Sequence, residues 1–119
     1  MNYFGTFGST EEEALNLLMP VVDNALKAHE RGNYQAYLSV ITADLAKKVS
    51  EEGFIRAYHE IAPQLGRLKS KTLLASLRRG QDPMLIFAAK YENTQDDIII
   101  NITFKNATTP PLIAWMWIE

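Results

Sequence analysis

The spacing of apolar residues changes abruptly near Gly66. Before Gly66, apolar residues recur every three or four positions, which is the period of an amphipathic helix. After it, the chain breaks into short β-branched runs, often alternating apolar and polar, that are separated by turn residues. This change of period predicts an α+β fold: three N-terminal helices packed on one face of a curved four-stranded antiparallel meander.

The first helix has clear start and stop signals. Ser9 or Thr10 can cap it, and Gly32 is a natural stop. Pro20 lies inside the pattern and predicts a kink or a restart of the helix. The apolar stripe expected to face the core consists of Leu15, Leu18, Met19, Val22, Leu26 and His29.

Two further helices are predicted before the strands. The first is short and covers about 34–41, while residues 42–49 fit either another helical turn or a loop. Ser50 is the expected cap of the next helix, and Pro63 with Gly66 is expected to end it. The buried stripe of this helix consists of Phe54, Tyr58, Ile61 and Leu65.

Four strands follow, and the short turns between them require antiparallel pairing. Even positions of the third strand, Ile98 to Phe104, are expected to face the helices. The last strand is apolar on both faces, with Ile113, Trp115 and Trp117 sharing one of them, which is typical of a strand covered on both sides. The strands are predicted at about 68–78, 84–91, 97–105 and 112–118.

The order of these elements resembles that of the nuclear transport factor 2-like superfamily. The first helix ends in Glu30-Arg31-Gly32-Asn33-Tyr34, the third opens with Ser50-Glu51-Glu52-Gly53-Phe54, and an aromatic-rich strand closes the meander. The resemblance covers about 15–118 and is nearest to short bacterial members of unknown function. It implies a cystatin-like fold, in which a curved sheet wraps around a long helix. Residues 41–49 look too short for the hairpin that many members insert there, and whether they form one stays open. Members include isomerases, dehydratases, hydrolases and scaffolds, so the fold alone assigns no function.

Composition and charge exclude several classes of protein. A net charge of -2 argues against broad capture of nucleic acid, and the absence of cysteine excludes disulfides and thiolate sites. No apolar run approaches the roughly 18 residues of a membrane-spanning helix. Residues 1–8 lack the features of a secretory signal. We therefore expect a soluble, cytoplasmic, single domain over 1–119, without membrane or nucleic-acid partners and without a cofactor.

Residues 1–8 form an aromatic arm that contains Tyr3, Phe4 and Phe7. Three aromatic side chains in a segment without periodicity suggest that the arm packs on an apolar surface. That surface is either a face of the sheet or a partner chain.

The leading functional hypothesis is a non-enzymatic module that forms a homodimer through the sheet and holds a small apolar ligand between helices and sheet. The apolar residues expected on one face of the sheet form a patch that is too large for a monomer to expose to water, and a homodimer would cover it. The expected dimer surface consists of Leu85, Phe87, Ile113, Trp115 and Trp117. The expected ligand pocket consists of Tyr37, Phe54, Tyr58, Ile100, Ile102, Phe104 and Met116.

The alternative hypothesis is a small-molecule isomerase or dehydratase. Asp44 with Tyr37 or Tyr58 would supply its acid–base pair. The strand residues expected to line the pocket carry no proton donor or acceptor, which favours the module. His29 is expected in a structural role on the first helix, and His59 on the surface. Neither histidine has a carboxylate three or four residues away, so no metal site is expected.

Overall fold

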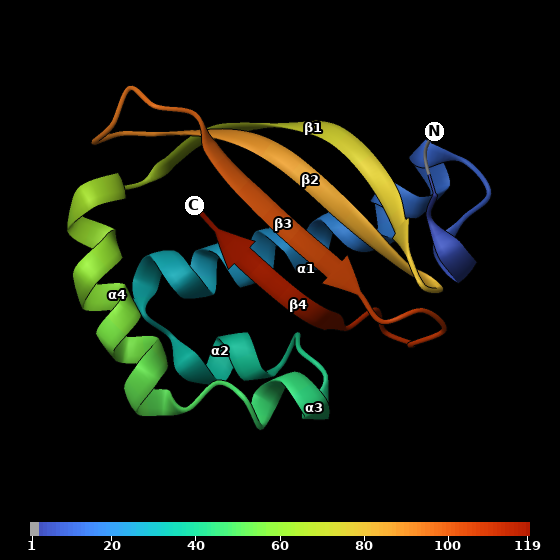
Figure 1. Cartoon of the computed structure of the whole chain (residues 1–119), viewed down its shortest axis with the longest axis horizontal. Helices are drawn as coiled ribbons and strands as arrows, with labels where there is room; N and C mark the ends of the chain where they lie inside the picture. The colour runs from blue at the N-terminus through green and yellow to red at the C-terminus, as the bar shows by residue number, and fades with distance from the viewer. Residues whose placement is uncertain (1–2) are drawn as a thin grey trace.

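The chain forms helices on one side of a single antiparallel sheet (Figure 1). The computed structural model describes residues 3–119. Figure 1 shows the longest helix behind the sheet, two short helices beyond the edge of the last strand, and the second long helix at one end. The α+β class predicted from the change of period is confirmed.

α1 (Glu11–Arg31) is one continuous helix. The Thr10 side chain accepts a hydrogen bond from a backbone N–H of the first turn, which satisfies one of its free donors. Pro20 neither breaks nor restarts the helix, because it is exposed and water can reach the carbonyl that its missing N–H leaves free. Gly32 ends the helix at a φ of 65°, where a Cβ would lie 2.8 Å from the Tyr58 ring.

Three shorter helices follow, so residues 3–119 hold four α-helices rather than the three predicted. They are α2 (Tyr34–Leu38), α3 (Ala43–Ala46) and α4 (Glu51–Leu65). The segment 42–49 therefore forms one helical turn and then a connection. Thr42 caps that turn, because its hydroxyl accepts the Leu45 N–H at 3.1 Å.

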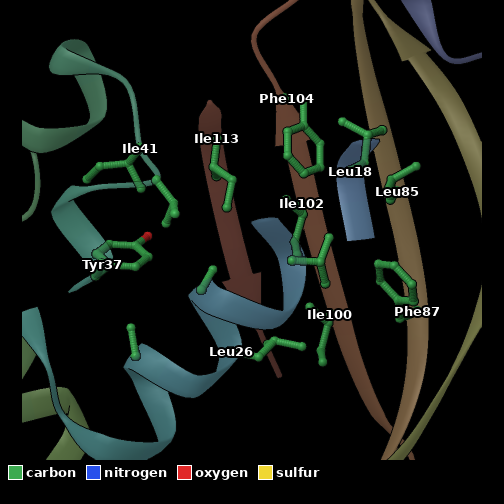
Figure 2. Close-up of a cluster of buried hydrophobic side chains, with 14 of the residues drawn as sticks. Leu18, Leu26, Tyr37, Ile41, Leu85, Phe87, Ile100, Ile102, Phe104 and Ile113 are labelled. Atoms are coloured by element: carbon green, nitrogen blue, oxygen red, sulfur yellow. The ribbon is translucent and has the colours of Figure 1, made fainter. Parts of the chain in front are cut away.

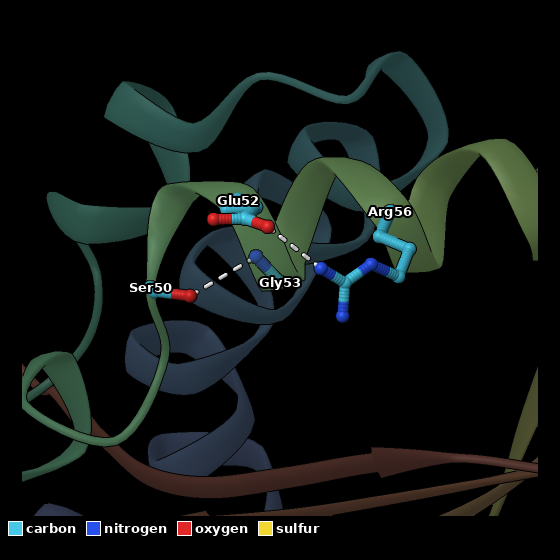
Figure 3. Close-up of polar contacts among 4 residues, drawn as sticks. All are labelled: Ser50, Glu52, Gly53 and Arg56. Carbon is cyan, nitrogen blue, oxygen red and sulfur yellow. Dashed lines mark hydrogen bonds and ion pairs between the residues drawn. The ribbon is translucent and has the colours of Figure 1, made fainter.

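α4 begins at the predicted cap (Figure 3). The Ser50 hydroxyl accepts a hydrogen bond from the Gly53 N–H at 3.0 Å, and Glu52 pairs with Arg56 at 2.8 Å one turn later. The helix continues through Pro63 and ends at Leu65, so Pro63 is not its end.

The sheet is a four-stranded meander in the order β1–β2–β3–β4, with every neighbouring pair antiparallel. At the free side of β4, one parallel bridge joins Ile113 to Ile41: the Thr42 N–H donates to the Ile113 carbonyl at 2.9 Å. The strands are β1 (Leu68–Arg79), β2 (Asp82–Tyr91), β3 (Ile98–Phe104) and β4 (Ile113–Ile118).

The core lies between α1 and the sheet (Figure 2). The alternation predicted for β3 is confirmed, because its four even positions are buried on the side facing α1. Residues of α1, β2, β3 and β4 meet there with almost no exposed surface: Leu18, Val22, Leu85, Phe87, Ile100, Ile102, Phe104 and Ile113.

Leu85 and Phe87 are core residues, which corrects their assignment to a dimer surface. They are 0% and 1% exposed and pair with Ile102 and Ile100 on the α1 side of the sheet. β2 is apolar on both faces, so its sequence does not show which face the helices cover.

Ile113 also belongs to the core, and a β-bulge is the reason. Phe104 pairs with Ile113 while Thr103 pairs with Trp115, so β4 advances two residues where β3 advances one. The extra residue turns Ile113 to the α1 side. Trp115 and Trp117 keep the opposite face and are 46% and 51% exposed.

The described part of the aromatic arm packs on the chain's own core; residues 1–2 of the arm lie outside the described residues. Phe4 and Phe7 are buried, and the Phe7 ring meets Phe104 edge to face at a centroid distance of 6.1 Å. The Tyr3 N–H donates to the Ser76 carbonyl at 3.1 Å. Packing within the chain therefore accounts for the burial of Phe4 and Phe7.

Candidate ligand-binding cavity

A cavity of about 370 Å³ lies where the end of α1, the inner side of α4 and the ends of β2 and β4 meet. Its volume is within the range of about 300–1,000 Å³ that is usual for small-molecule sites. The α4 residues that line the cavity are spaced three or four positions apart, so they share one face of the helix. Apolar residues dominate the wall, among them Leu26, Ile61, Leu65, Met116 and Ile118.

Two of the polar residues on the wall, Glu30 and Tyr91, are near neighbours. One Glu30 carboxylate oxygen accepts the Leu68 N–H at 2.8 Å, which joins the end of α1 to the start of β1. Burial, and secondarily the nearby negative charge of Glu30, raises the pKa of Tyr91 to about 12. The Tyr91 phenol is therefore neutral at physiological pH.

His29 lies between the cavity and the aromatic part of the core. Its ring centroid is 4.7 Å from that of Tyr37 and 5.0 Å from that of Phe54. The Nε2 atom is buried and has no hydrogen-bond partner among residues 3–119. Desolvation lowers the pKa of His29 to about 4, so the imidazole is neutral at pH 7.

Only part of the predicted pocket lines this cavity. Tyr58 and Met116 are on its wall. The prediction is wrong for the other five residues because α1 fills the space over the centre of the sheet, which leaves the cavity at one corner. The five are packed in the core: Tyr37, Phe54, Ile100, Ile102 and Phe104.

The structure does not assemble the predicted acid–base pair. Asp44 is exposed on α3 and is not part of the cavity wall, Tyr37 is buried, and only Tyr58 reaches the cavity. Burial raises the pKa of Tyr37 to about 12.

Glu30 and Tyr91 were not among the residues predicted for a site. The two residues come together where the last turn of α1 meets the end of β2, and no local sequence pattern indicates such long-range proximity. His29 was placed on the apolar stripe, where the structure has it, yet nothing in the stripe distinguished a cavity wall from the core.

Within residues 3–119, no group of three or more histidine or acidic side chains could hold a metal ion. Over the same residues, no helix combines the length and the hydropathy needed to cross a membrane. Searches with this chain found no matching family model, no matching curated protein and no matching solved structure.

Proposed function

We propose that this protein is a non-enzymatic binding module whose corner cavity holds a small apolar molecule. The observation that carries the proposal is the cavity itself, an apolar space of about 370 Å³ beside a well-packed core. The polar groups around it are poorly suited to move a proton. One Glu30 oxygen holds a backbone N–H, and the His29 Nε2 is shielded by the protein.

The proposal includes a cystatin-like arrangement of the nuclear transport factor 2-like type. Two features support it: the long α1 lies against the sheet, and Gly32 at its end contacts the Tyr58 ring of α4 closely. The motif after the first helix thus has a packing role, since a side chain at Gly32 would collide with that ring. The assignment to the superfamily rests on this motif and on the order of elements.

The cavity predicts that octanol, a small uncharged apolar probe, stabilises the protein. A ligand that binds only the folded state raises the melting temperature, and we expect saturating octanol to raise it by several degrees. Ala57→Phe, which places a ring into the cavity wall, should abolish the shift. Melting curves by circular dichroism, with and without octanol, measure both effects.

The matched control is Glu60→Phe, because Glu60 is exposed on the same helix and is not part of the cavity wall. This variant should retain the octanol shift. A wild-type melting temperature that octanol leaves unchanged would contradict the proposal, as would an equal loss of the shift in both variants.

The second part of the proposal is a homodimer through the outer face of the sheet. Cross-strand pairing places Met84, Thr103 and Trp115 in one row and Ile86, Asn101 and Trp117 in the next. These rows carry no charge and expose two tryptophans. A two-fold contact sets a surface against its own copy, so an uncharged face is compatible with itself where a charged one would repel.

Trp115→Glu is expected to convert the dimer to a monomer. The substitution places two like charges near the two-fold contact and removes a large apolar side chain from each copy. Light scattering at tens of micromolar should show half the mass of the wild type. Leu17→Glu makes the same change at a residue that is 51% exposed on α1 and should remain dimeric. A monomeric wild-type protein would refute this part.

A further inference from the structure

A polar hollow adjoins the apolar cavity and carries two arginines. Arg31, the last residue of α1, and Arg67, just before β1, both line it. The hollow and the cavity have four lining residues in common: Glu30, Tyr58, Ala62 and Gly66. A single molecule of modest length can therefore occupy both spaces.

Neither guanidinium group has a counter-ion in the described chain. The ion pairs within residues 3–119 join other residues, and no side-chain hydrogen bond involves the guanidinium of Arg31 or Arg67. A free guanidinium presents a planar set of donors that fits a carboxylate through two parallel hydrogen bonds. The hollow thus offers cationic donors beside an apolar space.

Two carboxylates beside the start of β1 accept hydrogen bonds from the backbone. Glu30 accepts the Leu68 N–H at 2.8 Å, and Glu92 accepts the Arg67 N–H at 2.9 Å. Each of these carboxylates fixes the start of β1 and leaves the arginine side chains free. Glu30 remains a negative charge on the cavity wall.

We propose that the ligand is an amphipathic monocarboxylic acid, with its apolar body in the cavity and its carboxylate at Arg31 and Arg67. This inference rests on the proposed binding function and adds the chemical class of the ligand. Apolar burial supplies affinity along the body, and the arginines fix the orientation of the acid. A ligand bound in this way has one end at the open rim and the other beside Met116.

Octanoate, octanol and octylamine separate the inference from the function on which it rests. The three probes share an apolar chain and differ in the charge of the head. By calorimetry at neutral pH, we expect octanoate to bind about tenfold more tightly than octanol, and octylamine more weakly than both. Added salt should weaken the binding of octanoate and leave the affinity for octanol unchanged.

Charge removal at the rim tests the assigned residues. The double variant Arg31→Gln with Arg67→Gln should bind octanoate no better than octanol, while its octanol affinity stays at the wild-type value. Arg79→Gln, at the far end of β1, is the matched control and should keep the full preference. Both arginines of the hollow are exposed, so the double variant is expected to fold.

The outcomes differ for the two ideas. If octanol binds and octanoate binds no more tightly, the inference fails and the binding function stands. The same holds if octylamine binds most tightly of the three, because the negative charge of Glu30 would then determine the preferred head group. If none of the three probes binds, the proposed function fails. Phosphatidylglycerol vesicles test whether the arginines bind a lipid surface instead. If the wild-type protein sediments with these vesicles, the double variant does not, and neither protein binds octanoate, the inference is also overturned.

Discussion

Phe87→Ala is expected to lower the free energy of unfolding by about 3–5 kcal/mol. The Phe87 ring is 1% exposed and packs between α1 and the sheet, so its removal leaves a cavity that the surrounding backbone cannot close. Urea unfolding followed by circular dichroism, at one fixed protein concentration, measures the loss.

Leu74→Ala is the matched control, because Leu74 lies in the neighbouring strand β1 and is 57% exposed. It should change stability by no more than about 0.5 kcal/mol. The same pair tests the corrected dimer surface, since Phe87→Ala should leave the mass in light scattering unchanged. A Phe87→Ala protein of wild-type stability and half the mass would restore Phe87 to the interface.

Local patterns predicted the elements of this fold well. The caps at Thr10 and Ser50 and the stop at Gly32 are hydrogen-bonding and conformational requirements of single residues, and the structure has them where the sequence placed them. The alternation in β3 was equally informative, because only one of its faces is uniformly apolar.

The errors in the predicted dimer surface have two physical origins. β2 is apolar on both faces, so its sequence leaves open whether Leu85 and Phe87 face the core. β4 is also apolar on both faces, and there a bulge turns Ile113 to the side of α1. A single inserted residue in the ladder exchanges the faces of a strand, and no composition signal marks it. Of the residues predicted for the dimer surface, only Trp115 and Trp117 are exposed.

The cavity could not be predicted because it depends on how whole elements pack. α1 covers the centre of the sheet and α4 meets only its corner, which leaves space beside the small side chains Ala57 and Ala62. Glu30 on the wall of that space is held by its hydrogen bond from the Leu68 N–H. Positions on a helix predict which face is buried, but they do not predict which buried face lacks a neighbour.

Acid is expected to destabilise the protein through His29. The unfolded chain protonates this residue near pH 6.5, whereas burial lowers its pKa to about 4 in the folded state. Between these values the unfolded state binds one more proton, so stability falls as the pH falls through this window. The contribution is absent above about pH 6.5 and reaches about 3 kcal/mol near pH 4.

His29→Leu should remove this part of the pH dependence while keeping an apolar side chain against Tyr37 and Phe54. Carboxylates elsewhere titrate in the same range, so the informative quantity is the difference between the two stability profiles measured by urea unfolding across it. His59→Leu is the matched control, because His59 is exposed, and its profile should follow the wild type. If His29→Leu loses as much stability on acidification as the wild type, the buried imidazole is not the acid-sensitive group. If His29→Leu fails to fold, His29→Gln provides the same comparison, because the amide does not titrate.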